Sequence, residues 1–92
     1  MTIKDWDVTE YLDSPESIAG YLDAALEDGD TAMLQAAIGD VAKAMGMTAV
    51  AANAGVSRTS LYKSLTADAA PSIETINKVL QALGVRLSVS AA

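Results

Sequence analysis

The sequence predicts an all-α fold, a small bundle of about five helices followed by a short C-terminal β-strand. Alanine and leucine account for much of the apolar content, and both residues favour helix. Ser, Asp and Gly stand where helices are expected to start and end. Between them, apolar side chains recur every three or four residues, which is the period of a helix with one buried face.

The 92 residues are expected to form a single domain, residues 1–92, around one hydrophobic core. Hydrophobic residues make up 51% of the chain, which excludes a protein that is disordered by composition. We divide the domain into acidic N-terminal helices at 1–46, a helix-turn-helix at 47–65, a last helix at 72–84 and a strand at 85–90.

The N-terminal half begins with a short helical turn, predicted from the capping-box spacing of Asp7 and Glu10. Ser14 and Pro15 then start a longer helix, with Ser as the N-cap and Pro at the first helical position. Gly29 ends this helix. Its predicted inward side chains are Ile18, Tyr21, Leu22, Ala25 and Leu26.

Two further helices follow the same logic. Asp30 caps a helix that Gly46 stops, and Ser72 caps the last helix, which Gly84 closes. Pro71 prevents a helix from running through the preceding loop. The predicted inward residues are Leu34, Ala37, Ile38, Val41, Ala42 and Met45 in the first of these helices, and Ile73, Ile76, Val79, Leu80 and Leu83 in the last.

Residues 85–90 alternate between apolar and polar side chains, which predicts a strand. A lone strand leaves its backbone groups unpaired and therefore requires a partner. The simplest partner is the same strand of a second copy, so we expect a two-fold homodimer. Pairing with residues 3–8 and a tail that alternates by chance are the alternatives.

Residues 47–65 have the features of two short helices joined by a three-residue turn. Thr48 is expected to cap the first helix and Ser57 the second. Ala51 is small where the second helix passes close, and Gly55 permits a positive φ in the turn. Two helices at a steep angle would allow the second to enter the major groove of DNA.

The outward face of the second helix is polar and basic, which supports DNA binding. We expect Arg58 to contact guanine and Lys63 to contact a phosphate. The helix ends at Thr48 and Ser57 offer amide groups that can hold phosphates. The predicted DNA-binding residues are Thr48, Ser57, Arg58, Thr59, Tyr62 and Lys63, and Thr66 lies on the same face. For any one of these residues, an ordinary helical hairpin with a polar exposed face is the alternative.

Charge is unevenly distributed along the chain, whose formal net charge is −6. Residues 1–42 contain ten acidic residues and one Lys, a net charge of −9, whereas residues 43–92 contain five basic and two acidic residues, a net charge of +3. This asymmetry suggests two faces with different partners. An acidic surface that only keeps the protein soluble is the alternative.

The absence of Cys and His removes thiolate chemistry, the commonest metal ligand and the usual general base at neutral pH. Glu27, Asp28 and Asp30 cluster in a helix-ending turn, where a solvated corner is expected and the ligand spacing of a Ca²⁺ loop is lacking. We therefore predict no enzyme activity, no cofactor and no metal site. The polar start and the lack of an apolar stretch of about 20 residues predict a cytoplasmic protein with no signal peptide and no membrane partner.

The chain resembles the addiction-module antidote proteins, which have a helix-turn-helix of the Xre/Cro type. The resemblance covers nearly the whole chain and is densest at AIGDVAKAMGM (residues 37–47) and GVSRTSLYKSL (residues 55–65). It begins at residues 7–12 and 18–22 and closes at residues 76–89. These long blocks are more specific than a helix-turn-helix pattern alone.

The resemblance implies a lambda-repressor-like fold and an antitoxin that pairs with a toxin of the RelE/ParE type. It also implies repression of its own operon by a dimer bound to a palindromic operator. The recognition role would fall on Ser57, Arg58, Thr59, Tyr62 and Lys63. Related domains often have a Gln just after the first N-cap, and here that position is Ala49, so its DNA contact is missing.

A basic toxin is expected to meet the acidic surface of the N-terminal half, because complementary charge raises association rates and sharpens partner choice. The acidic residues concerned are Asp13, Glu16, Asp23, Glu27 and Asp28. Solvated helix faces are the alternative for this surface.

Two other functions compete with a DNA-binding antitoxin. A stand-alone Cro-like transcriptional regulator would share the DNA face and lack a toxin partner. A protein-interaction module without DNA binding is favoured by Ala49 and by the six cations, which allow only about 3–4 phosphate contacts per subunit.

Overall fold

The computed structural model describes residues 14–27, 29–66 and 69–91, and all regular secondary structure in these segments is helical. The helices are α2 (Pro15–Leu26), α3 (Thr31–Met45), α4 (Met47–Ala54), α5 (Arg58–Ser64) and α6 (Ile73–Ala82). The prediction of an all-α bundle of about five helices is therefore confirmed within these segments. The helical turn predicted to begin at Asp7 lies outside them.

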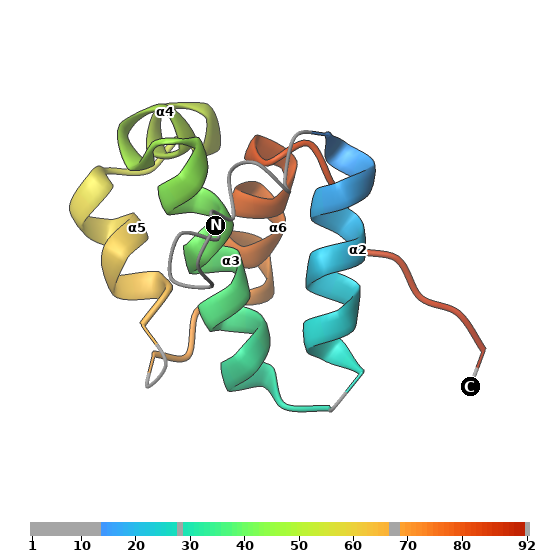
Figure 1. The fold of residues 1–92 in the computed structure, drawn as a ribbon. Coiled ribbons are helices and arrows are strands. Elements are labelled where there is room, and N and C mark those ends of the chain that lie inside the picture. The colour runs from blue at the N-terminus through green and yellow to red at the C-terminus, as the bar shows by residue number, and fades with distance from the viewer. Residues whose placement is uncertain (1–13, 28, 67–68, 92) are drawn as a thin grey trace, which may run out of the picture.

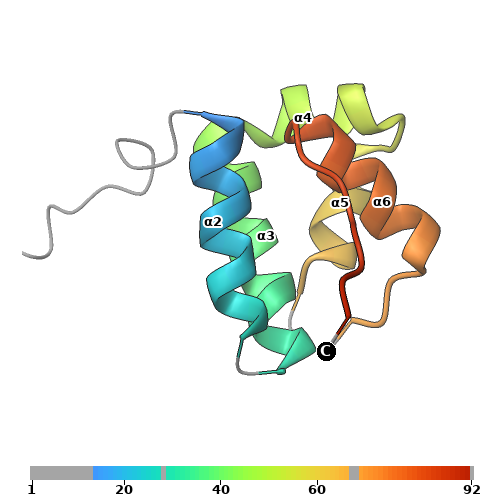
Figure 2. The same ribbon diagram turned by 90° about the vertical axis from the view of Figure 1, so that its right-hand side faces the viewer.

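The helices are arranged around α3, which runs through the middle of the molecule (Figure 1). Helix α2 packs beside α3 and runs in the opposite direction. Helix α4 follows at one end of α3 and contacts α3, α5 and α6. Helices α2 and α5 lie at opposite edges in Figure 1, with α3 and α6 between them, and Figure 2 shows the molecule from the α2 side. The short helices α4 and α5 therefore form one side of the bundle.

Four of the predicted N-caps are confirmed. In each, the capping side chain accepts a hydrogen bond from a backbone N–H in the first turn, which satisfies one of the amide groups that a helix start leaves unpaired. The N–H groups of Ser17, Ala32, Ser60 and Thr75 donate to the side chains of Ser14, Asp30, Ser57 and Ser72, at 3.2, 2.9, 3.0 and 3.1 Å respectively.

The predicted capping role of Thr48 is wrong. Helix α4 begins at Met47, so Thr48 lies inside its first turn, and the N-cap is Gly46, which makes no side-chain cap. Gly46 is also the C-cap of α3, with φ 105° and ψ 110°. Because this single glycine both ends α3 and starts α4, the chain reaches the helical conformation before Thr48 can act as a cap.

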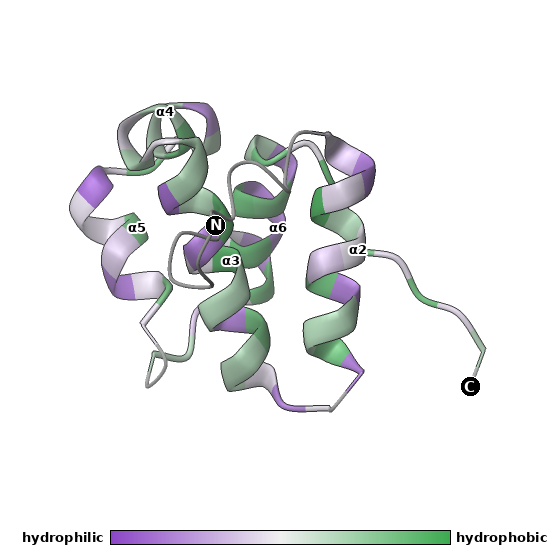
Figure 3. Cartoon of the chain, in the orientation of Figure 1, coloured by the Kyte–Doolittle hydropathy of each residue, from purple (hydrophilic) through white to green (hydrophobic). Residues whose placement is uncertain are grey.

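The core lies where all five described helices meet. No polar or charged side chain is buried among the described residues. Figure 3 shows strongly hydrophobic segments on α3 and α6 at the centre of the molecule. The buried residues are Ile18, Leu22, Ala37, Ile38, Val41, Ala42, Met47, Val50, Ala51, Ala54, Leu61, Leu65, Val79, Leu80 and Leu83.

Three side chains that the helical period placed inward are exposed. Leu26, Met45 and Ile73 have exposed fractions of 42%, 45% and 77%. Leu26 and Met45 are the last residues of α2 and α3, and Ile73 is the first residue of α6. The helical spacing of apolar residues identifies the inward face of each helix correctly. It does not show at which residue the neighbouring helix stops covering that face.

The predicted C-terminal strand is not found: residues 85–90 have no regular secondary structure. The N–H of Val85 donates to the carbonyl of Leu80 at 3.0 Å and closes the end of α6. Beyond it, Leu87 is 44% exposed and Val89 is 99% exposed, and the tail leaves the helices on the side of α2 (Figures 1 and 2). A strand requires a ladder partner, and the described residues contain no strand that could provide one.

Candidate nucleic-acid interface

Helices α4 and α5 are joined by residues 55–57, the three-residue turn that the sequence predicts. Gly55 has φ 73° and ψ 31°, the left-handed conformation that glycine adopts without a steric penalty. Its N–H donates to the carbonyl of Ala52 at 3.2 Å, and the N–H of Val56 donates to Ala51 at 3.0 Å. Ala51 is 3% exposed, as its predicted close contact requires.

Helix α5 has one face in the core and one in solvent. Leu61 is 1% exposed, and Leu65, just after the helix, is 8% exposed. The remaining face is coloured mostly as hydrophilic or neutral in Figure 3. It carries four of the predicted DNA-binding residues, all of them exposed: Arg58, Thr59, Tyr62 and Lys63.

Arg58 and Tyr62 contact each other one helical turn apart. The guanidinium carbon of Arg58 lies 5.5 Å from the centroid of the Tyr62 ring, within the range of a cation–π interaction. The Tyr62 side chain is nevertheless 41% exposed. The Tyr62 ring therefore restrains the Arg58 guanidinium on a surface that is open to solvent.

The other two predicted residues lie at helix starts. The Ser57 hydroxyl accepts from the Ser60 N–H at 3.0 Å and donates to the Ser60 hydroxyl at 2.9 Å, so it is engaged within α5. Thr48 is exposed in the first turn of α4. Four of the six predicted residues thus share one surface of α5, Ser57 serves as its cap, and Thr48 belongs to the other helix.

Gln35 in α3 is a structural residue that the sequence analysis missed. Its side-chain N–H₂ donates to the carbonyls of Ala69 and Thr66 at 2.9 and 3.1 Å and approaches that of Ser64 at 3.5 Å. These bonds fasten the chain that leaves α5 to α3. The partners are 29 to 34 residues away in sequence, so no local pattern could have identified them.

Leu65, the C-cap of α5, lies over Gly39 of α3. A Cβ atom placed on Gly39 would lie 3.7 Å from the carbonyl oxygen of Leu65 and 3.8 Å from its Cβ, which is ordinary van der Waals contact. Gly39 itself is buried. The buried side of α3 therefore faces the end of α5 at this position.

The acidic residues predicted to meet a toxin and the two cations of α5 lie on different sides of the molecule. Glu16, Asp23 and Glu27 are exposed on or just after α2, whereas Arg58 and Lys63 are on α5, at the opposite edge (Figure 1). Asp13 and Asp28, predicted to belong to the same acidic surface, are outside the described residues. The separation of charge is incomplete, because Arg86 shares a hollow with Asp23 and Asp40 lines a hollow beside α5.

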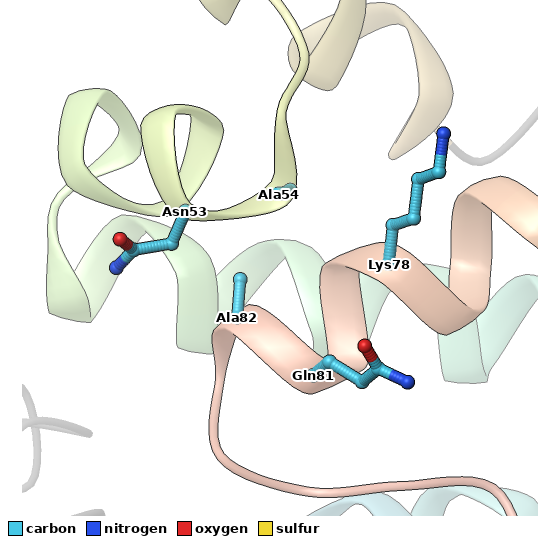
Figure 4. A pocket seen from close by; sticks show the side chains of 5 residues that line it. All are labelled: Asn53, Ala54, Lys78, Gln81 and Ala82. Carbon is cyan, nitrogen blue, oxygen red and sulfur yellow. The ribbon is translucent and has the colours of Figure 1, made fainter.

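A hollow of about 340 Å³ lies between the end of α4 and α6. Figure 4 shows Asn53 from α4 and Lys78 and Gln81 from α6 around it. The Lys78 ammonium pairs with Glu74 at 3.3 Å. The amides of Asn53 and Gln81 and the paired ammonium of Lys78 could form hydrogen bonds to a ligand in this hollow, but they do not favour acid–base chemistry.

The described residues show neither a metal-binding cluster nor a membrane-spanning helix. They contain no group of three or more His, Cys, Asp or Glu side chains that could hold a metal ion. None of their helices is both long enough and apolar enough to cross a membrane.

The comparisons with known proteins identify a family. The sequence model of a family described as "Probable addiction module antidote protein" matches residues 2–91. A protein of Haemophilus influenzae that has no assigned function is 39% identical over 87 residues, which cover 95% of this chain and 90% of that protein. No solved structure shows a significant match. The chain therefore belongs to the family of probable addiction module antidote proteins.

Proposed function

We propose that this antidote protein is a DNA-binding antitoxin that reads operator DNA with α5. The observation that carries the proposal is the exposed face of α5, where Arg58, Thr59, Tyr62 and Lys63 lie together. The three-residue turn and the buried side of α5 hold this face in a fixed position relative to α4. A recognition helix also presents an exposed polar face to the major groove, so this exposed face of α5 supports the proposal.

Each side chain has a distinct proposed role. Arg58 contacts guanine through its two parallel N–H groups, a contact worth about 1–3 kcal/mol of base discrimination. Lys63 contacts a phosphate, which positions the protein without specifying a sequence. Thr59 and Thr48 supply hydroxyl groups for bases or backbone.

The proposed binding species is a homodimer on a palindromic operator, through which the protein represses its own operon. The tails at residues 85–90 are the proposed contact between the two copies. Two observations support this: Val89 is 99% exposed, and the backbone of the tail beyond Val85 has no hydrogen-bond partner among the described residues. Antiparallel pairing of two tails would supply those partners.

The proposed toxin partner is a basic protein of the RelE/ParE type that meets the acidic side of the molecule. Exposed Glu16, Asp23 and Glu27 supply the complementary charge. This surface lies at the opposite edge from α5 (Figure 1), which leaves the DNA face accessible. Membership of the antidote family supports a regulatory role rather than an enzymatic one.

The DNA proposal is tested by fluorescence anisotropy with the duplex upstream of the protein's own gene at two salt concentrations. The double variant Arg58→Ala/Lys63→Ala is expected to lose specific binding. Lys78→Glu changes the net charge by the same two units on α6, outside α5 and outside the tail, and is expected to bind nearly as wild type. A folded wild type that does not prefer its operator would contradict the proposal and favour an interaction module, which the net charge of −6 also favours.

The toxin proposal is tested by co-purification with the protein encoded by the adjacent gene. Glu16→Lys/Asp23→Lys/Glu27→Lys is expected to slow association and weaken the complex at low salt. Arg58→Ala/Lys63→Ala serves as the control and should leave toxin binding unchanged. Toxin binding that is undiminished after the three charge reversals would contradict the proposal that the toxin binds the acidic surface.

A further inference from the structure

A second hollow, of about 210 Å³, lies between α3 and α5 and borders the proposed DNA face. Lys43 from the last turn of α3 lines it, together with Tyr62 and Thr66 from α5 and the residues just after it. Lys43 lies outside the helix-turn-helix predicted at residues 47–65, and no local sequence pattern connects it with DNA. The fold brings this cation to the side of the recognition helix.

The side-chain groups around the hollow differ in what they can still bind. The Lys43 ammonium and the Tyr62 hydroxyl have no hydrogen-bond or ion-pair partner among the described residues. The Thr66 hydroxyl already donates to the carbonyl of Lys63 at 3.0 Å, so it has no proton left for a ligand. The hollow therefore offers one cation and one free O–H donor.

We propose that this hollow binds a phosphate of the DNA backbone, with the Lys43 ammonium as counter-charge and the Tyr62 hydroxyl as hydrogen-bond donor. The inference rests on the proposed DNA binding of α5 and extends the interface to α3. The volume exceeds the roughly 30 Å³ share of a water molecule several-fold, which leaves space for a phosphate group and its waters. Lys43 thus adds affinity and register but no sequence preference.

Asp40 also lines the hollow and opposes the phosphate charge. Its carboxylate accepts a hydrogen bond from the Tyr21 hydroxyl at 3.3 Å, and the side-chain oxygen of an Asn could accept the same bond. The site therefore provides two substitutions with opposite expected effects. Lys43→Ala should weaken DNA binding, and Asp40→Asn should strengthen it.

The test measures affinity for the operator duplex and for a shuffled duplex of the same length across a salt series. Lys43→Ala is expected to weaken both by the same factor and to reduce the slope of log affinity against log salt by about 0.9 for each bound subunit. When the salt concentration rises from 50 to 200 mM, this difference in slope lowers the ratio of wild-type to variant affinity by about 3.5-fold per subunit. Asp40→Asn should change affinity in the other direction.

The control is Lys78→Ala, which removes the same charge from α6, where Lys78 pairs with Glu74. An unchanged salt slope for Lys43→Ala, an equal effect of Lys78→Ala, or a loss confined to the operator duplex would each overturn the phosphate site. If the wild type binds neither duplex, the proposed function fails and the phosphate site fails with it. If the wild type binds and Lys43→Ala behaves as wild type, only the phosphate site fails.

Discussion

The guanidinium carbon of Arg58 lies 5.5 Å from the centroid of the Tyr62 ring, on the exposed face of α5. Cation–π contacts at exposed sites are worth about 0.5–1 kcal/mol. The contact restricts the rotamers of Arg58 before any ligand arrives, so less side-chain freedom is lost on binding. The ring also borders the hollow that Lys43 lines, which places Tyr62 between the proposed base contact and the proposed phosphate contact.

Tyr62→Ala and Tyr62→Phe are expected to separate these two contacts. Tyr62→Ala removes the ring, so discrimination at the base that Arg58 reads should fall by about 0.5–1 kcal/mol. Tyr62→Phe keeps the ring and loses only the hydroxyl, so it should weaken binding slightly and equally for all sequences. Anisotropy measurements on operators with single base changes test this. Equal discrimination by the two variants would show that the ring does not position Arg58.

The features that the sequence predicted correctly depend on residues close together in the chain. A Ser or Asp cap binds an N–H two or three residues later, as Ser57 does with Ser60. The turn at Gly55 is closed by bonds to Ala51 and Ala52. The polar face of α5 follows from helical spacing alone. Most of the candidate site could therefore be predicted before the fold was known.

The features that sequence reasoning missed depend on contacts between distant segments. Gln35 finds its carbonyl partners beyond α5, and Lys43 is beside α5 only because the fold places residues of α3 and α5 around one hollow. The strand predicted for residues 85–90 is not found in the described residues for a related reason. Alternation describes the side chains of a strand, but a strand also requires a neighbouring backbone that the described residues do not supply.

Gly55→Ala and Gly20→Ala are expected to change stability in opposite directions. A Cβ at either position meets nothing within 4 Å, so packing does not distinguish them. Gly55 has φ 73°, where a Cβ costs about 1–2 kcal/mol, so Gly55→Ala should lower the free energy of unfolding. Gly20 lies inside α2 with no positive φ, so Gly20→Ala should raise it by about 0.5–1 kcal/mol. Urea unfolding measures both, and the same sign for both variants would contradict the assigned role of Gly55.

Gln35→Met is expected to lower the free energy of unfolding by about 1–2 kcal/mol, because the carbonyls of Thr66 and Ala69 lose their donor. Met and Gln have similar helix propensity, so the change isolates the hydrogen bonds. Gln81→Met is the matched control, since Gln81 is exposed on α6. Urea midpoints give the stabilities, and amide exchange at residues 64–70 should accelerate in Gln35→Met alone. Equal effects of the two variants would show that Gln35 does not fasten the segment after α5.

Tyr21 is expected to make the stability of the fold depend on pH in the alkaline range. Burial raises the pKa of Tyr21 above its ordinary value of 10.0, and the negative charge of Asp40 and the hydrogen bond to it raise the pKa further. The unfolded chain therefore loses this proton at lower pH than the folded chain does. The stabilisation is fully present below about pH 10 and declines as pH rises through the folded pKa.

The variant Tyr21→Phe tests this, because phenylalanine has no hydroxyl group to ionise. The difference in unfolding temperature between wild type and Tyr21→Phe should therefore shrink above pH 10. In Asp40→Asn the folded pKa should lie closer to the ordinary value, so the decline should be smaller and should end at lower pH, because only burial, the largest cause, remains in full. Parallel pH profiles for wild type and Tyr21→Phe would show that the contact between α2 and α3 at Tyr21 does not resist ionisation.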